Sequence, residues 1–330
     1  MIFFCMTPLH LLIAKEVVVE KNLFGKYILV LMCKKGVNVN KYYFDKMPNS
    51  LYSIKISMSK FFIINIIKTI FISIKIRRYA SIDINVTTGN WKIFYPRLLA
   101  RLLGVKFFSV MDDGAGSLIK SPYFSKFSER KISKIIFYII GKNYLYSNIM
   151  SNIVNYYTIF EQVNPAFGGH KIRLKLFKSQ EFADKINLPN DKKNISILLL
   201  PSYSDDTNSI SFKEEKKITK NIINKFQIDY AIPHPVNNVK RYKNIGCELI
   251  VNNKIAEEVL ISLLGRFNIT LVGFRSTVLL NMKNISLSSG VGEIRLVNVD
   301  IWKNRPKHLY FEDKYDIFTN SEFNTVYYDY

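Results

Sequence analysis

The sequence predicts an α/β protein with two Rossmann-like domains that face a cleft. Short apolar runs alternate with helical patterns in both halves of the chain, which favours doubly wound parallel sheets. With 330 residues, the chain is long enough for two such domains. We place an N-terminal domain at 1–170, a C-terminal domain at 171–310, and a tail at 311–330 that packs back onto the N-terminal domain.

The first half begins with an apolar run at 2–5, which Thr7 and Pro8 follow as a helix cap and a first helical residue. The alternation then continues, with strands expected at 2–5, 27–32, 81–86 and 105–111, and helices at 11–20, 61–76, 91–103 and 128–146. The polar and basic segment 171–194 is expected to join the two domains.

The second half repeats this alternation. Strands are expected at 195–200, 270–272 and 284–287, and helices at 212–225, at 254–264 and after Thr277. In such a sheet, polar groups that follow a strand lie at its carboxyl end, which is where ligands bind.

The composition is basic, with 47 lysines and arginines against 26 acidic residues and a net charge of +21. This charge attracts anionic partners and predicts peripheral binding to an anionic membrane surface. A buried helix is the first interpretation of the apolar segment 61–76, and an interfacial helix is the second. The basic residues are scattered through both halves, which disfavours nucleic acid as a partner. A homodimer stays an open alternative.

Cysteine and histidine spacing argues against a metal site. The three cysteines form no Cys-x-x-Cys pair, and the four histidines show no ligand spacing. We therefore expect no disulfide framework, no metal and no cofactor, in a reducing cytoplasm. The opening run Met1–Cys5 also lacks the basic leader and cleavage site of a signal peptide.

Two carboxylate pairs follow apolar runs. Asp112 and Asp113 precede Gly114, and Asp205 and Asp206 follow a second strand-like run. Repulsion within a pair and burial at a strand end both raise a pKa, which suits a general base. A strand-end turn is the simpler explanation of the first pair, and a helix-start charge is an alternative for the second.

Three motifs in the second half suggest a phosphate site. His234 lies between two prolines, so its loop is stiff, and the imidazole can protonate or hydrogen-bond a leaving phosphate. A histidine satisfied within a turn is an equal alternative. Ser276 and Thr277 precede a helical pattern, where hydroxyls and backbone N–H groups bind phosphate. Glu258, early in another helix, can accept ribose hydroxyls or simply offset the helix dipole.

The order Asp-Asp-Gly, His-Pro, glutamate and Ser-Thr resembles that of the bacterial lipooligosaccharide and O-antigen sialyltransferases of glycosyltransferase family 52. The segments Thr7–His10 and Leu198–Asp206 look like that family too. Other bacterial sialyltransferases and polysialyltransferases share the Asp-Asp-Gly and His-Pro motifs. The resemblance implies a GT-B fold and an inverting, metal-independent enzyme. Its donor would be CMP-Neu5Ac, and its acceptor a galactose-type sugar of a lipopolysaccharide, lipooligosaccharide or O-antigen glycan, with α2,3 linkage favoured.

The resemblance also implies roles for single residues. Asp113 would deprotonate the acceptor hydroxyl on the N-terminal, acceptor side, with Asp206 as a rival base and Asp112 and Asp205 beside them. His234, on the C-terminal, donor side, would assist the departure of cytidine monophosphate. The implied substrate- and nucleotide-binding residues are His10, Gly114, Pro235, Glu258 for ribose, and Ser276 and Thr277 for phosphate.

Two alternatives stay open at this stage. One is another GT-B glycosyltransferase of surface-polysaccharide synthesis with a different sugar or linkage. The other is a basic protein without enzymatic activity that binds nucleic acid or membranes. For the sialyltransferase, the expected location is the cytoplasm of a Gram-negative bacterium, peripheral at the inner membrane face.

Overall fold

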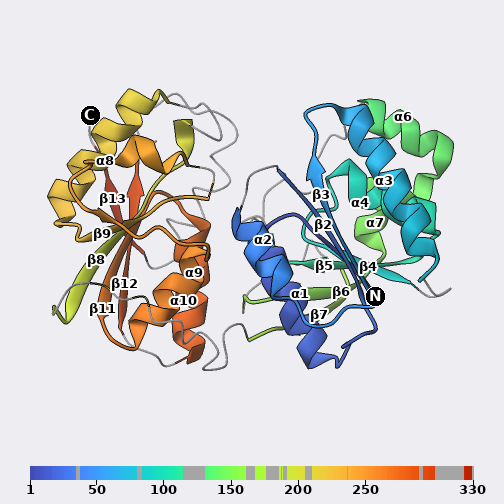
Figure 1. Ribbon diagram of the computed structural model, residues 1–330, viewed down its shortest axis with the longest axis horizontal. Helices are drawn as coiled ribbons and strands as arrows, with labels where there is room; N and C mark the ends of the chain where they lie inside the picture. Colours follow the sequence, from blue (N-terminus) through green and yellow to red (C-terminus); the bar gives the residue numbers. More distant parts are fainter. Residues whose placement is uncertain are drawn as a thin grey trace. The chain divides into compact units, whose positions relative to one another are not determined.

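The computed structural model describes residues 1–34, 38–79, 84–113, 131–160, 168–175, 186, 188, 192–204, 210–235, 237–289, 293–301 and 323–328. The chain divides into two compact units, Met1–Leu176 and Phe177–Tyr330, each with its own sheet (Figure 1). The expected boundary at 170/171 lies too early. His170–Arg173 pairs with a strand of the first sheet and therefore belongs to the first unit.

The first unit contains a seven-stranded parallel sheet with the order β3-β2-β1-β4-β5-β6-β7. Its strands are β1 (Ile2–Cys5), β2 (Ile28–Lys34), β3 (Tyr52–Met58), β4 (Asn85–Thr88), β5 (Phe107–Met111), β6 (Ile153–Thr158) and β7 (His170–Arg173). Its helices are α1 (Pro8–Glu20), α2 (Asn38–Asp45), α3 (Phe62–Arg77), α4 (Phe94–Leu103), α6 (Lys131–Ile140), the short 3-10 helix η2 (Lys142–Tyr144) and α7 (Tyr146–Ser151).

Helices cover both faces of the first sheet. Helices α1 and α2 lie on one face, and α3, α4, α6 and α7 on the other (Figure 1). The interior strands β1 and β2 are apolar on both faces because both faces are covered, as expected for a parallel sheet. The core under α4 combines strand residues such as Phe4 and Val110 with Leu99 and Phe137 of the helices, all fully buried.

The second unit contains a six-stranded parallel sheet with the order β10-β9-β8-β11-β12-β13. Its strands are β8 (Asn194–Leu199), β9 (Tyr230–Ile232), β10 (Glu248–Leu249), β11 (Asn268–Gly273), β12 (Ile294–Asp300) and β13 (Asn324–Tyr327). Its helices are α8 (Phe212–Phe226), the 3-10 helix η5 (Val239–Tyr242), α9 (Ala256–Leu264) and α10 (Thr277–Ser289).

One expectation for the second half was wrong. The segment 284–287 is not a strand but part of α10, whose buried Leu279, Met282 and Ile285 follow a helical spacing. The expected tail, 311–330, lies mostly outside the described residues. Asn324–Tyr327 pairs in parallel with β12 and extends the second sheet at its edge.

Both sheets share one strand order, in which the first strand of the unit pairs with the second on one side and the fourth on the other. The chain reverses direction across the sheet at the β1/β4 pair and at the β8/β11 pair. Loops after such a pair of strands open a crevice, and ligands of doubly wound sheets bind there. Within the ranges given above, no helix has the length and apolar character needed to cross a membrane.

Candidate functional site

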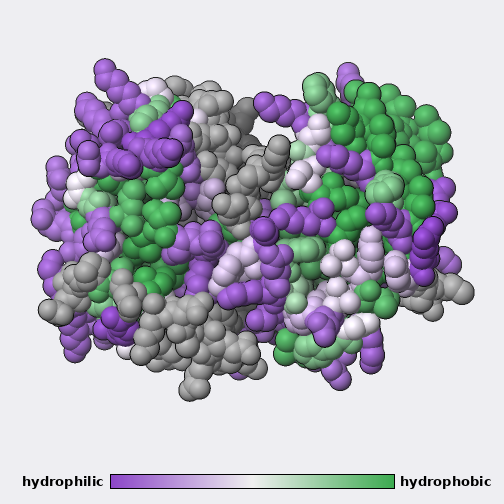
Figure 2. Space-filling model, viewed as in Figure 1, coloured by the Kyte–Doolittle hydropathy of each residue, from purple (hydrophilic) through white to green (hydrophobic). Residues whose placement is uncertain are grey.

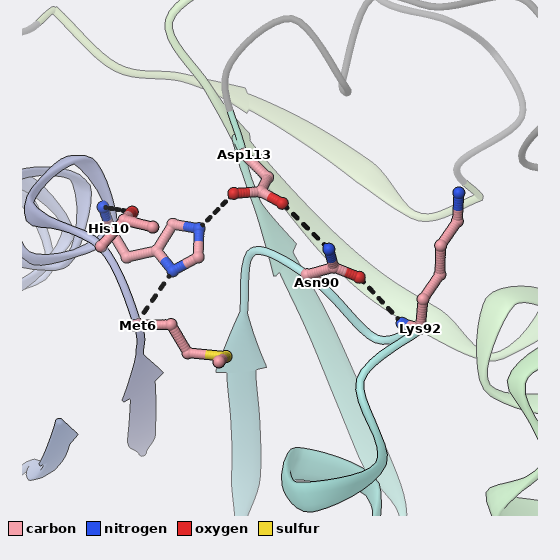
Figure 3. Close-up of polar contacts among 6 residues, drawn as sticks. Met6, His10, Asn90, Lys92 and Asp113 are labelled. Atoms are coloured by element: carbon pink, nitrogen blue, oxygen red, sulfur yellow. Dashed lines mark hydrogen bonds and ion pairs between the residues drawn. The ribbon is translucent and has the colours of Figure 1, made fainter. Parts of the chain in front are cut away.

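The first cluster lies at the carboxyl ends of β1, β4 and β5, where the first sheet reverses its strand order (Figure 3). His10 comes from the first turn of α1, directly after β1. Thr7 caps that helix, and its hydroxyl accepts from the His10 backbone N–H at 3.2 Å. The His10 ring is thus fixed by its place in a capped first turn.

Hydrogen bonds define the tautomer of His10. The backbone N–H of Met6 donates to Nδ1 of His10 at 3.2 Å, so Nδ1 carries no proton. The ring proton therefore sits on Nε2, which donates to Oδ1 of Asp113 at 2.9 Å. A neutral imidazole in this arrangement holds the carboxylate and has both nitrogens engaged. His10 is thus a positioning group for Asp113.

Asn90 holds the other oxygen of the same carboxylate. Its Nδ2 donates to Oδ2 of Asp113 at 3.1 Å, while its Oδ1 accepts from the backbone N–H of Lys92 at 3.0 Å. The bond from Lys92 fixes the orientation of the amide, because only the oxygen can accept it. Each Asp113 oxygen therefore accepts from at least one side chain of the protein, and about a third of the Asp113 side chain is exposed.

These contacts decide the charge of Asp113. Burial alone would raise its pKa, but the hydrogen bonds from His10 and Asn90 and the nearby charge of Lys92 together hold the pKa below its usual value. The expectation of a raised pKa was therefore wrong. Burial lowers the pKa of Lys92 to about 8, against the opposing effect of Asp113. Asp113 is thus a stable carboxylate at neutral pH.

Gly89 leaves space for the His10 ring. A Cβ atom built on Gly89 would lie 2.0 Å from Nε2 of His10, closer than any real contact. Glycine at this position is therefore a condition for the bond between His10 and Asp113. The Gly89-Asn90 turn after β4 supplies both the space and the second donor.

Asp112 differs from its neighbour in every respect. It is fully buried, and its two oxygens accept from the Tyr156 hydroxyl at 2.7 Å and the Ile159 backbone N–H at 2.6 Å. These bonds tie the end of β5 to β6. Asp112 therefore anchors the strand end, and of the pair only Asp113 is placed to meet a substrate.

The second cluster lies after β11, at the strand reversal of the second sheet. Arg275 adopts a left-handed backbone (φ 47°), an uncommon conformation for a residue with a side chain. The Oδ1 of Asn298 accepts from its backbone N–H at 2.9 Å, and its guanidinium donates to Asp300 at 2.6 Å in a buried ion pair. The turn that presents the next two residues is thus held from both sides.

Ser276 and Thr277 start α10. The Ser276 hydroxyl accepts from the Val278 backbone N–H at 3.3 Å, and both side chains are partly exposed. The start of a helix of 13 residues combines hydroxyls, backbone donors and the positive end of the dipole. This end of α10 can therefore hold a phosphate.

His234 follows β9, the neighbour of β8 in the same sheet. Its side chain is exposed, as is that of Pro235. Asn237 fixes the loop, because its backbone N–H donates to the His234 carbonyl and its side chain donates to the Pro201 carbonyl, both at 2.9 Å. The loops after β8 and β9 are therefore tied together on the same edge of the sheet.

Glu258 lies in the first turn of α9 and is buried. Its carboxylate pairs with Lys254 at 3.0 Å. The adjacent Glu257 accepts from Asn281 of α10 at 2.7 Å, and burial raises its pKa against the lowering effect of its hydrogen bonds. Glu257 thus links two helices, while Lys254 orients Glu258.

Three residues of the predicted site, Gly114, Asp205 and Asp206, lie outside the described residues. Of the predicted first-half residues that are described, the structure brings His10 and Asp113 into direct contact. In the part of the chain that is described, no three His, Cys, Asp or Glu side chains are grouped to hold a metal ion. The expected independence from metals stays a prediction.

Several supporting residues escaped the sequence analysis. Gly89, Asn90 and Lys92 follow a strand end, but no motif marks them. Arg275 precedes the Ser-Thr pair, and its partner Asp300 is 25 residues further on. The usable signal was the polar character of residues that directly follow apolar runs.

The fold and the two clusters define a protein with two Rossmann-like domains of the GT-B type. A structure of UDP-GlcNAc 2-epimerase from Methanocaldococcus jannaschii, in complex with UDP-GlcNAc and UDP, has a TM-score of 0.53 at 10% identity. The match covers 99% of this chain and 88% of that one. For the UDP-GlcNAc-bound 2-epimerase from Neisseria meningitidis, the TM-score is 0.52 at 9% identity, with 89% and 81% covered.

The similarity extends to a glycosyltransferase. The spinosyn rhamnosyltransferase complexed with thymidine diphosphate has a TM-score of 0.51 at 7% identity, with 99% of this chain and 85% of that chain covered. At such identities these likenesses show the fold alone. None of the curated proteins matches the sequence.

The family is shown by sequence. The model of glycosyltransferase family 52 matches residues 26–298, which is most of the chain. The chain belongs to glycosyltransferase family 52, and it is a glycosyltransferase.

Proposed function

We propose that this glycosyltransferase is an inverting sialyltransferase. It moves sialic acid from CMP-sialic acid to a terminal galactose-type sugar of a surface glycan, with α2,3 linkage. Family membership and the order of the sequence motifs support the donor and acceptor. The observation that carries the mechanism is the carboxylate of Asp113, held at a strand end by His10 and Asn90 and still partly exposed.

In this mechanism, Asp113 is the general base. The acceptor hydroxyl oxygen attacks the anomeric carbon of sialic acid from the face opposite the phosphate, and its proton passes to Asp113. The bond from that carbon to the phosphate oxygen breaks, and the electron pair leaves with cytidine monophosphate. Configuration inverts because a single displacement occurs.

His10 and Asn90 prepare Asp113 for this step. Their two bonds fix the orientation of the carboxylate before the acceptor arrives, which lowers the entropic cost of reaching the reactive geometry. They also keep it ionised, since together with Lys92 they lower its pKa. A carboxylate that was already protonated could not take the acceptor proton.

The second unit holds the leaving group. Ser276, Thr277 and the start of α10 bind the phosphate, and His234 donates to the departing oxygen. Glu258, oriented by Lys254, accepts from the ribose hydroxyls. Asp206 is the rival base, and the variants Asp113→Asn and Asp206→Asn distinguish between the two residues.

The test is incubation with CMP-sialic acid and a panel of galactosides, with product mass and released cytidine monophosphate measured together. We expect a sialylated galactoside and an equal amount of cytidine monophosphate, unchanged when EDTA is present. Consumption of UDP-sugars with release of a nucleoside diphosphate, and no turnover of CMP-sialic acid, would assign a different donor. Loss of turnover in EDTA, restored by a divalent ion, would refute metal independence.

A further inference from the structure

Helix α3 lacks the polar outward face of an ordinary surface helix, although Ile72 and Ile76 on its inner side are fully buried. Its polar side chains Asn65, Thr69 and Ser73 are buried, at a spacing of four residues. Asn65 donates to the Tyr95 hydroxyl of α4 at 3.2 Å, and Thr69 donates to the Asn65 carbonyl at 2.8 Å. The polar groups of this helix are thus satisfied inside the protein.

The outward face of α3 is apolar. Large exposed side chains run along it from Phe61, just before the helix, through Ile63, Ile64, Ile67, Ile70, Phe71 and Ile74. Ile63 is 69% exposed. A surface helix of a soluble protein shows the reverse pattern, with polar residues outward.

Helix α6 also has an apolar outward face. Ser133 and Phe137 face the core, while Ile132, Ile135, Tyr138 and Ile139 are exposed, with Ile139 at 78%. Both helices pack on α4 through one ring, since Phe94 of α4 contacts Phe62 of α3 at 5.1 Å and Phe137 of α6 at 5.0 Å between centroids. Together they form the α3/α6 face, the continuous hydrophobic area over these helices in Figure 2.

The charge around the α3/α6 face has one sign. Residues 60–79 and 131–150 contain no aspartate or glutamate, and their basic residues are Lys60, Lys68, Lys75, Arg77, Arg78, Lys131, Lys134 and Lys142. Lys75 lies over the Phe71 ring and Lys142 over the Tyr138 ring. Long basic side chains that lie along apolar residues can reach anionic headgroups while the apolar groups enter the interface.

This charge pattern distinguishes between a second copy of the chain and a lipid bilayer as the partner of the α3/α6 face. In a two-fold dimer formed through this face, the basic residues of the copies would meet each other with no acidic partner on either helix. Protein interface cores are also depleted in lysine. We propose that the α3/α6 face docks the protein on the surface of an anionic lipid bilayer, with the isoleucines at headgroup depth and the basic residues against the lipid phosphates.

The test is flotation of the full chain with vesicles of phosphatidylcholine alone or mixed with phosphatidylglycerol. We expect binding to the mixed vesicles that weakens in high salt. The double variant Ile67→Glu/Ile139→Glu should bind at least about tenfold more weakly, because two apolar anchors become anionic. Val19→Glu/Val251→Glu is the control, since both valines are exposed elsewhere and the change in net charge is identical.

Folding and self-association are measured beside flotation. Thermal melting should be the same for the unaltered chain and both double variants, and Ile67→Ser/Ile139→Ser replaces the first variant if it fails to fold. Equal vesicle binding by the α3/α6 variant and the unaltered chain would overturn the proposal. A second outcome would also overturn it: the unaltered chain does not bind vesicles but self-associates in sedimentation velocity, and only the α3/α6 variant loses that self-association.

Discussion

An aspartate stands at the end of the fifth strand in each sheet, and the two have opposite surroundings. Asp113 follows β5, is partly exposed, and receives bonds from a neutral imidazole and an amide. Asp300 ends β12, is buried, and pairs with the guanidinium of Arg275. The same place in the topology thus holds a partly exposed carboxylate in the first sheet, which we propose as the base, and a buried ion pair in the second.

The largest expected effect is a loss of turnover when Asp113 is replaced. Asp113→Asn should lower turnover by about 10²–10⁴-fold, because the amide cannot take the acceptor proton. Calorimetry should show cytidine monophosphate binding kept, since the proposed nucleotide site lies in the second unit. Asp45→Asn, an exposed change in α2, is the matched control. Near wild-type turnover in Asp113→Asn, with collapse in Asp206→Asn, would move the base to the second pair.

The matching change in the second sheet should act on stability. Asp300→Asn leaves the Arg275 guanidinium buried without its counter-charge, a defect of about 3–5 kcal/mol. Chemical denaturation should show a lower midpoint with a similar slope. A stability equal to that of the unaltered chain would show that Asp300 is not the structural aspartate that we describe.

Variants at the start of α10 test the proposed phosphate site separately from the proposed base, Asp113. Ser276→Ala/Thr277→Ala should weaken cytidine monophosphate binding by about ten- to hundredfold, since two hydrogen bonds to a charged group are lost. The swap Ser276→Thr/Thr277→Ser keeps both hydroxyls and is the control. Calorimetry measures the affinities, and unchanged affinity in the double alanine variant would remove these residues from the phosphate site.

Gly89→Ala tests whether the His10–Asp113 bond needs the space beside it. The added methyl meets the imidazole, so the ring must shift, with a cost in stability of about 1–3 kcal/mol and a loss of turnover. Gly265→Ala is the control, because a Cβ there meets nothing within 4 Å. If both variants have the same melting temperature and the same turnover, the close approach of Gly89 to His10 is not needed for activity.

The smallest expected effect is a shift in pH dependence. The pKa of Asp113 is lower in the folded protein than the value of about 3.9 for an aspartate in the unfolded chain. The stability that the ionised carboxylate contributes is therefore fully present above about pH 3.9, and it is lost as the pH falls through the lower folded pKa. Asn90→Ala removes one bond that lowers this pKa, so the acidic limb of kcat/KM should move to higher pH. Asn143→Ala, an exposed change in η2, should leave the limb in place.

The sequence predicted the fold better than the site. Apolar runs such as 2–5 and 195–200 are buried in parallel sheets, so hydrophobicity alone marks them. The strand β3 was missed because its side chains alternate between partly buried and exposed. The segment 284–287 was misassigned because four residues cannot separate a strand from the end of a helix.

Within the site, the sequence located the ends of strands but not the partners across them. Asp113 and His10 were both named, yet nothing in the chain order indicates that residues 103 positions apart share a hydrogen bond. The direction of the Asp113 pKa was wrong for the same reason. Burial was foreseen, but the donors from His10 and Asn90 come from loops that only the fold brings together.

The shared strand order has a consequence for synthesis. In each sheet the first strand made, β1 or β8, lies in the interior, and later strands add on either side until the edges are reached. The whole first sheet, up to Arg173, has been synthesised before β8 begins at Asn194. Since domains fold as units, N-terminal first, the nascent chain can complete the carboxylate site before any residue of the phosphate site has been made.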